Sequence, residues 1–173
     1  MVKILSIGGA VQDVFLSNSP EFKAVCEDPH QCFMKLELGA KANVNKIDFS
    51  TGGGATNAAV TFARQGLDSY FMGVVGDDVA AHAVLTDLDS EGVDTRHVRT
   101  SQQYNTGYSV ILLAPSGERT ILTYRGASTH YIHRDIASEN IDADWIYMSS
   151  MSGQIDIADD IFSQIATVQA LFK

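Results

Sequence analysis

The sequence predicts an α/β fold, with a doubly wound parallel sheet and a smaller antiparallel β element. Two observations predict the parallel sheet: short β-branched runs end in glycine, and segments with helical periodicity follow them. A third predicts the antiparallel element, because two strand-like runs follow each other between Tyr104 and Tyr124 with no helix between them. We therefore expect one domain, or one domain with a small appendage.

The first strand is predicted at residues 3–7, a compact apolar run that stops at Gly8-Gly9, and Asp13 lies just past that turn. Residues 32–38 alternate between apolar and polar side chains, which predicts a half-buried antiparallel strand. A turn at residues 39–43 and a second candidate strand at 44–49 follow.

A helix is predicted from Ala55 to Gln65, because small and apolar residues keep helical spacing and Gly66 can end the helix. A strand at residues 69–75 then ends in Gly76-Asp77-Asp78, and a second helix continues to about Ser90. This strand and helix order is typical of a parallel sheet.

Two strands at residues 106–114 and 118–124 form the predicted hairpin, and we expect them to join the strands near Cys32 and Val44. A buried strand at 145–149 and an amphipathic helix at 155–172 follow, with an apolar stripe of Ile157, Ile161, Ile165 and Val168. Three parallel strands and three helices are few for a doubly wound sheet, so we expect the sheet to be incomplete.

The charge balance excludes several kinds of partner. The 173 residues carry 12 Lys and Arg against 21 Asp and Glu, a net charge of -9. Binding to DNA, RNA or an anionic membrane requires clustered positive charge, so none of these is an expected partner. The first apolar run is too short for a signal peptide or a membrane span, and we expect a cytoplasmic protein. Cys26 and Cys32 have no second metal-binding pair, which favours a reducing compartment over a zinc site.

Two groups of residues could bind a ligand at the carboxyl ends of the predicted strands. Gly52-Gly53-Gly54 precede a helix, where bare backbone and free amides can contact oxygen atoms, although the same glycines could serve tight packing alone. Asp13 could accept two hydroxyl hydrogens, as a sugar would offer, or it could be an ordinary turn or cap residue.

Six motifs, taken together, give the sequence a strong resemblance to a known family. Their order and spacing resemble the ribokinase-like, or PfkB, carbohydrate and nucleoside kinases, over essentially all 173 residues but only the amino-terminal part of the family pattern. The motifs are Ile7-Gly8-Gly9-Ala10-Val11-Gln12-Asp13, Gly52-Gly53-Gly54-Ala55-Thr56-Asn57-Ala58-Ala59 followed by Leu67, Gly73-Val74-Val75-Gly76-Asp77-Asp78, Glu91-Gly92-Val93-Asp94, Thr106-Gly107 and Gly117-Glu118-Arg119-Thr120.

The resemblance implies a ribokinase-like domain over residues 1–173, with a small β-sheet lid formed by segments at about 15–50 and 104–124. It also implies that substrate hydroxyls are bound by Asp13, Gly52, Gly53 and Asn57. Tyr108, Arg125 and Ser150 could also face the substrate, or could be ordinary lid and surface residues. We further expect Gly53→Val to impair binding more than stability.

The resemblance implies ATP and Mg²⁺ as cofactors, but the family segments that hold them are mostly absent from these residues. The Gly-Ala-Gly-Asp segment with the catalytic base does not occur, and no Asn-x-x-Glu segment follows the six motifs, so we expect no catalytic or metal-binding residue here and little activity from this chain alone. Three interpretations remain: part of a sugar or nucleoside kinase, a noncatalytic sugar- or nucleoside-binding module, or one half of a split kinase. We also expect self-association, or a complementing second half.

The remaining titratable residues suggest no second site. The histidines show no paired spacing, and we expect His30, His82, His97, His130 and His133 to be surface residues. Asp77 and Asp78 could bind a metal, but acids at a helix start also stabilise the helix dipole, and we favour that role.

Overall fold

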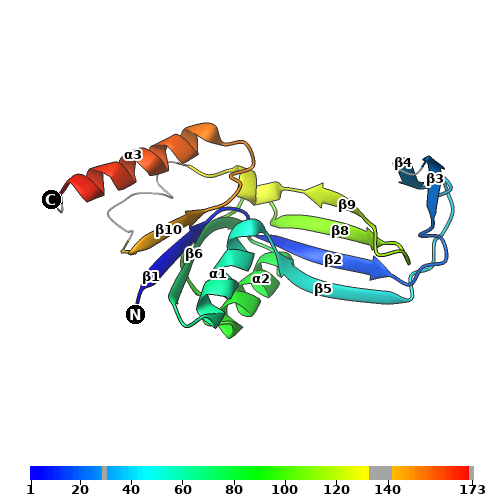
Figure 1. The fold of residues 1–173 in the computed structure, drawn as a ribbon, viewed down its shortest axis with the longest axis horizontal. Helices are drawn as coiled ribbons and strands as arrows, with labels where there is room; N and C mark the ends of the chain where they lie inside the picture. The colour runs from blue at the N-terminus through cyan, green and yellow to red at the C-terminus, as the bar shows by residue number, and fades with distance from the viewer. Residues whose placement is uncertain (29–30, 133–141, 172–173) are drawn as a thin grey trace. The chain divides into compact units, whose positions relative to one another are not determined.

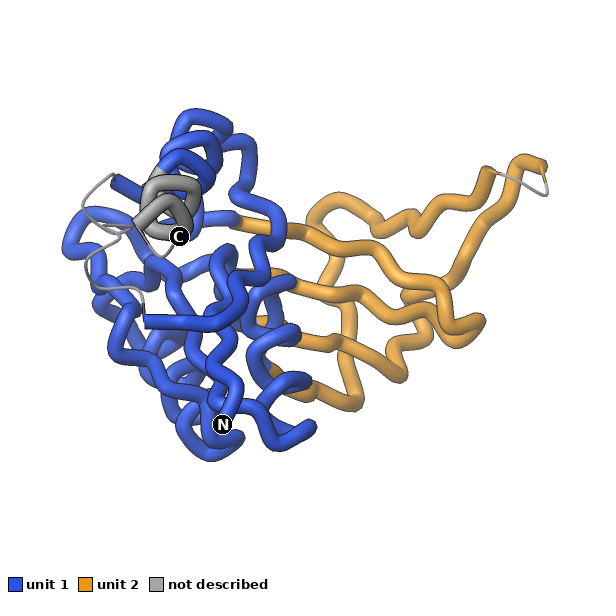
Figure 2. Tube along the Cα trace, turned by 60° about the vertical axis from the view of Figure 1, so that its left-hand side comes forward, with its two compact units in different colours: residues 1–12, 51–107, 125–173 blue, residues 13–50, 108–124 orange. Residues whose placement is uncertain are grey.

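The computed structural model describes residues 1–28, 31–132 and 142–171 (Figure 1). The chain divides into two compact units (Figure 2). Unit 1 comprises residues 1–12, 51–107 and 125–173, and unit 2 comprises residues 13–50 and 108–124.

Unit 1 is built on a parallel sheet of four strands. Their order across the sheet is β10-β1-β6-β7, and each neighbouring pair is parallel. The strands are β1 (Lys3–Ile7), β6 (Asp68–Gly76), β7 (Asp94–Ser101) and β10 (Trp145–Met148).

Helices cover both faces of this sheet, as Figure 1 shows. Helices α1 (Gly54–Arg64) and α2 (Val79–Ser90) lie on one face, and α3 (Ile155–Leu171) lies on the other. The alternation of strand β6 fits this arrangement, because Phe71 and Val75 pack in the core with α1 and α2, whereas Met72 and Val74 pack in the core with α3. A short 3₁₀ helix, η1 (Gly126–Thr129), adds Ala127 to the second core.

Most elements predicted for unit 1 are confirmed, with two differences at the sheet edges. Strand β7 was not predicted, because its sequence DTRHVRTS is polar and only half-buried. The strand at 145–149 is present as β10, but it is an edge strand with Trp145 68% exposed, so the prediction of a buried strand is wrong. Ile157 and Ile161 are buried as expected, and the side chains of Ile165 and Val168 lie outside the described part of the structure.

Unit 2 contains an antiparallel hairpin, as predicted. Strands β8 (Gly107–Leu113) and β9 (Arg119–Tyr124) pair with Tyr108 opposite Tyr124 and Ser109 opposite Thr123. The sheet order is β5-β2-β8-β9, with β5 (Lys46–Gly52) as the predicted second strand. Strand β2 (Val11–Ser17) was not predicted, and it places Asp13 inside a strand rather than just past a turn.

The strand expected at residues 32–38 differs from the prediction. Strand β4 (Gln31–Met34) is shorter and pairs only with β3 (Ala24–Asp28), as a separate two-stranded sheet. Of its residues, only Met34 is even half-buried, so the apolar alternation does not mark a core-facing strand. Cys26 and Cys32, opposite each other on the two strands, form a disulfide, which the expectation of a reducing compartment did not foresee.

The histidines are less uniform than expected. His82 is exposed, but His97 lies beside Tyr70 and His130 stacks on Tyr104 with ring centroids 3.4 Å apart. Both are half-buried, so the prediction of surface residues is wrong for these two. His30 and His133 lie outside the described residues. Among the helices that the structure describes, none is long and apolar enough to cross a membrane.

Asp78 caps helix α2 and ties it to the start of strand β8. Its carboxylate accepts hydrogen bonds from the backbone N–H of Ala81 at 2.8 Å and of Thr106 at 2.8 Å, and from the Thr106 hydroxyl at 2.7 Å. Burial is the largest single influence on the pKa of Asp78 and raises it, but these hydrogen bonds outweigh burial and hold the pKa below its usual range. The predicted role at the helix start is confirmed for Asp78, whereas Asp77 accepts a hydrogen bond from Gln102 at 3.0 Å.

Asp78→Ala is expected to lower the free energy of unfolding by about 2 kcal/mol at neutral pH, because α2 loses its cap and Thr106 loses an acceptor. The pKa of Asp78 is lower in the folded protein, so its stabilising contribution is present above the unfolded pKa and lost as the pH falls through the folded value. Urea unfolding at neutral and at acidic pH should therefore show the difference from wild type narrowing in acid. Asp77→Ala makes the same change one residue earlier at an exposed position, and an equal loss in both variants would contradict the capping role.

Candidate functional site

The start of helix α1 is built from glycines that approach other backbone closely. Gly53 precedes the helix with φ 115° and ψ 141°, a conformation that favours glycine. A Cβ atom on Gly53 would lie 2.2 Å from the carbonyl oxygen of Gly9, so no other residue fits without a backbone shift. The Thr56 hydroxyl, one turn into the helix, lies 2.8 Å from the Gly52 carbonyl oxygen and 2.9 Å from that of Gly53, and can donate to either.

The start of helix α1 has polar backbone groups without a side-chain partner. Within the described structure no side chain caps α1, so the first amides of the helix keep their donor capacity for another acceptor. The side chain of Asn57 is exposed in the first turn, where an amide can both donate and accept. Gly52, Gly53 and Asn57 therefore lie together, as the sequence predicted.

Ser149 is a further candidate residue that the sequence analysis did not name. It follows strand β10, and its backbone N–H donates to the Ile7 carbonyl oxygen at 3.0 Å. Its hydroxyl oxygen is buried and has no hydrogen-bond partner among the described residues. A Cβ atom on Gly8 would lie 2.3 Å from this oxygen and one on Gly54 would lie 3.1 Å from it. The hydroxyl is thus held between the end of β1 and the start of α1.

Ser150, the serine that the sequence analysis named, is the next residue along the chain. Ser150 is exposed, and its hydroxyl accepts a long hydrogen bond from the Ser152 backbone N–H at 3.3 Å. Arg125 is also exposed, and its guanidinium donates to the Ser152 hydroxyl at 3.4 Å. Arg125 and Ser150 therefore meet at Ser152, on the surface of unit 1. Their contacts are too long to hold either side chain firmly.

Asp13 and Tyr108 belong to unit 2 and are described separately from the residues of unit 1. Asp13 is half-buried on strand β2, where the hydroxyl of Ser109 on the neighbouring strand β8 hydrogen-bonds to it. Ser109 in turn lies 3.2 Å from the hydroxyl of Thr123 on β9, so a row of polar groups crosses three adjacent strands. Tyr108 is half-buried next to Ser109 in sequence.

Burial sets the electrostatics of Asp13. It raises the pKa of the carboxyl group above its usual range, and the hydrogen bond from Ser109 opposes that change only in part. A carboxylate that is costly to ionise and has spare acceptor capacity is suited to a ligand that brings hydroxyl donors. Among the described residues no group of three or more His, Cys, Asp and Glu side chains forms a candidate metal site.

The structure corrects the expected effect of substituting Gly53. We expected Gly53→Val to spare the fold, but the new side chain would meet the Gly9 backbone and would have to adopt a left-handed φ. Gly53→Ala is therefore expected to lower the free energy of unfolding by about 3 kcal/mol or more. Urea unfolding should show a smaller loss, roughly 1 to 2 kcal/mol, in Gly66→Ala, which has φ 82° but open space around the added Cβ. Equal losses would mean that the approach of Gly9 is unimportant.

Comparison with known proteins finds similar sequences and structures among sugar and nucleoside kinases. A segment of 79 residues is 35% identical to a ribokinase of Haemophilus influenzae and covers 46% of this chain and 26% of that protein. A segment of 102 residues is 30% identical to an aminoimidazole riboside kinase of Salmonella typhimurium and covers 58% of this chain and 32% of that protein. The fold matches the crystal structure of a fructokinase with bound ATP from Xylella fastidiosa, with a TM-score of 0.71 and 22% identity.

That structural match covers 97% of this chain and 48% of the fructokinase, so the chain spans about half the length of that protein. The predicted ribokinase-like α/β fold, incomplete relative to such neighbours, is confirmed. Residues 27–170 match the family described as pfkB family carbohydrate kinase, which is most of the chain. The chain therefore belongs to the pfkB family of carbohydrate kinases.

Proposed function

We propose that this chain supplies the substrate-binding part of a kinase that transfers a phosphoryl group from ATP to a hydroxyl of a sugar or nucleoside. The observation that carries the proposal is the start of helix α1, where Gly53 meets the Gly9 carbonyl oxygen without a side chain and the first amides have no side-chain cap. Relatives named ribokinase, aminoimidazole riboside kinase and fructokinase support the class of substrate, a small molecule rich in hydroxyl groups.

Each candidate residue has a chemical role in this proposal. Asp13 accepts hydrogen bonds from substrate hydroxyls, which replace the solvent that burial has removed from its carboxylate. Gly52 and Gly53 allow the substrate to approach the backbone, and Asn57 offers an amide at the same helix start. Tyr108, Arg125 and Ser150 are further candidate contacts, and the exposure of Arg125 and Ser150 allows these two side chains to move toward a ligand. The segments at 15–50 and 104–124 act as the lid that keeps water from the transferred phosphoryl group.

We further propose that the catalytic base and the groups that hold ATP and Mg²⁺ lie outside these 173 residues. The sequence contains no Gly-Ala-Gly-Asp segment, and no Asn-x-x-Glu segment follows the family motifs at residues 7–120. The chain covers 48% of the fructokinase that carries ATP. Phosphoryl transfer depends on positioning and on neutralising developing charge, so this chain alone should have almost no activity. We also propose that the complete kinase acts in the cytoplasm.

Two other functions are compatible with half a kinase domain, and binding measurements separate them. A noncatalytic sugar- or nucleoside-binding module would bind its ligand tightly without ATP, whereas a kinase fragment would bind weakly because its pocket is incomplete. One half of a split kinase would copurify with a second polypeptide. Isothermal titration calorimetry with pentoses, ketoses and nucleosides, followed by an ATP-coupled assay on a chain extended with downstream coding sequence, is the test. If the extended chain phosphorylates none of these compounds, the kinase proposal is wrong.

Asp13→Asn is expected to weaken sugar or nucleoside binding by about ten-fold to a hundred-fold, because a charged acceptor becomes a neutral one. The same variant should unfold at an equal or higher temperature near neutral pH. The pKa of Asp13 is raised in the folded protein, so the ionised carboxylate costs stability as the pH rises through the folded pKa. Below the usual pKa of an aspartate the carboxyl group is neutral in both states, and the advantage of Asn should disappear.

Calorimetric titration and thermal unfolding on the same preparations measure both effects. Asp48→Asn is the matched control, because it makes the same change in unit 2 at an exposed position whose carboxylate pairs with Lys46 at 2.7 Å. It should leave binding unchanged. Undiminished binding by Asp13→Asn would remove Asp13 from the site.

The 173-residue chain is expected to self-associate through strand β10, as a dimer or larger oligomer. Strand β10 is an edge of the parallel sheet, and Trp145 and Tyr147 on it are 68% and 42% exposed. Open strand edges with apolar side chains promote association. Light scattering over a dilution series should show the oligomer, and Trp145→Glu should weaken it.

Val79→Glu is the control for this experiment, because Val79 is 86% exposed at the start of α2, on no sheet edge. It should leave the association unchanged. If the chain is a monomer at every concentration, strand β10 does not mediate self-association.

A further inference from the structure

Among the described residues, the β3–β4 hairpin of unit 2 has few buried contacts. Its two strands form a sheet of their own, and all their residues are exposed except the half-buried Met34. The Lys35 ammonium pairs with the Glu27 carboxylate at 3.6 Å, but both side chains are exposed, and such pairs contribute little. An isolated two-stranded hairpin is only marginally stable in water.

The disulfide joins the two strands where they face each other. Cys26 and Cys32 are register partners six residues apart, with their Cα atoms 3.9 Å apart, and both residues are exposed. The bridge closes a short ring within the hairpin and links neither strand to the core of unit 2. It therefore constrains the hairpin locally and little else.

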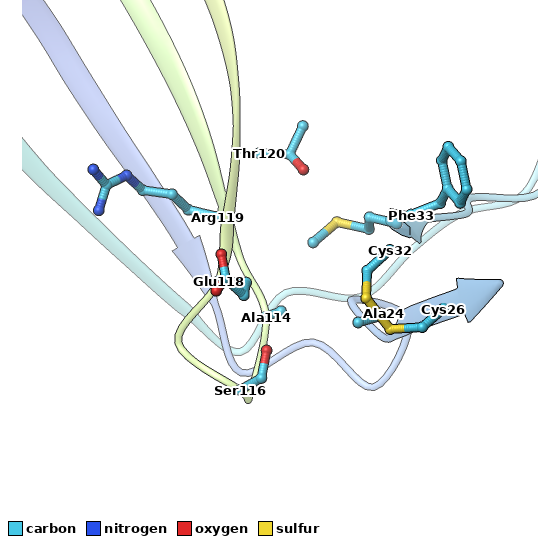
Figure 3. Close-up of a pocket in the computed structure, with 10 residues that line it drawn as sticks. Ala24, Cys26, Cys32, Phe33, Ala114, Ser116, Glu118, Arg119 and Thr120 are labelled. Atoms are coloured by element: carbon cyan, nitrogen blue, oxygen red, sulfur yellow. A yellow bond between two sulfur atoms is a disulfide. The ribbon is translucent and has the colours of Figure 1, made fainter. Parts of the chain in front are cut away.

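An open cavity of about 480 Å³ lies against this bridge (Figure 3). The hairpin side of the cavity includes Cys26, Cys32 and Phe33, and the opposite side is the β8–β9 turn with Ser116 and Glu118. Both sides belong to unit 2. The bridge thus borders open volume rather than a packed core, and a small or flexible thiol can approach it.

We propose that Cys26–Cys32 is a redox-active disulfide, a site of reversible modification by a dithiol reductant, and that its reduction releases the β3–β4 hairpin. One thiolate of the dithiol attacks a sulfur of the bridge. The Cys26–Cys32 bond breaks, and the other cysteine leaves as a thiolate that takes up a proton. The second thiol of the reductant then attacks the mixed disulfide, so two electrons pass to the cysteines and the dithiol becomes a disulfide.

The Cys26–Cys32 disulfide differs from a structural disulfide in two ways: both cysteines are exposed, and the hairpin that it closes forms a separate two-stranded sheet. Exposed disulfides are the more readily reduced ones, and the reduced hairpin has few other contacts to keep it folded. The rest of unit 2 does not depend on the bridge, because β8 and β9 keep their own antiparallel ladder from Tyr108 to Leu113. This inference does not rest on the proposed kinase function.

The test is hydrogen exchange and thiol counting on the intact chain in defined redox buffers. With excess oxidised glutathione, alkylation should label no thiol, and with dithiothreitol under native conditions it should label two. Amides of β3 and β4 should exchange at least about ten-fold faster in the reduced protein, because the hairpin opens. Amides of β8 and β9 should be unchanged. Reoxidation should restore the slow exchange.

The double variant Cys26→Ser with Cys32→Ser provides the control, because it should exchange as fast as reduced protein in every buffer. Three results would each overturn the proposal. The bridge fails to form in oxidised glutathione, it resists dithiothreitol in the folded protein, or the β3 and β4 amides exchange equally in the oxidised, reduced and double-variant forms.

Discussion

The close approach of Gly53 to the Gly9 carbonyl oxygen is the constraint on which the candidate site of unit 1 depends. A Cβ atom at Gly53 would lie 2.2 Å from that oxygen, so the end of β1 and the start of α1 can meet only as bare backbone. Two further contacts arise from the same arrangement. Ser149 fits against Gly8 and Gly54, and the hydroxyl of the buried Tyr131 donates to the Gly8 carbonyl oxygen at 2.7 Å. The backbone at Gly8-Gly9 is therefore in contact with the start of α1, with Ser149 after β10 and with Tyr131.

This packing explains why the two interpretations of the glycines, ligand binding and tight packing, are not alternatives. The same glycine-rich start leaves the first helix amides without a side-chain cap. A substitution at Gly53 therefore disturbs the fold and the site together, and it cannot report on binding alone. Asp13 is different. Partial burial makes its carboxylate unfavourable to ionise, so the charged side chain lowers the stability of the fold. A residue that weakens the fold slightly and has spare acceptor capacity is better evidence of a function than a glycine that the packing demands.

The elements that the sequence predicted well are those with a strong local pattern. Strands β1 and β6 are apolar runs that end in glycine, helix α1 keeps helical spacing, and the β8–β9 hairpin has a turn marked by Gly117. Strand β7 was not predicted, because its residues are mostly polar and are held in the sheet by pairing with β6 rather than by burial. Strand β4 was predicted too long because alternation at residues 32–38 implies a buried face, whereas Leu36 and Leu38 are 48% and 98% exposed. Alternation shows that a strand has two faces, but not whether anything packs on either.

The site residues divide in the same way between local and long-range information. Gly52, Gly53 and Asn57 are close in sequence, so a strand followed by a helix was enough to bring them together. Ser149 could not be distinguished from Ser150, because only the register of β10 against β1 decides which serine turns inward. The disulfide was missed for the same reason. A spacing of six residues indicates a disulfide only when β3 and β4 are known to pair with Cys26 opposite Cys32. In both cases the missing information was strand register, which the order of residues in the sequence does not show directly.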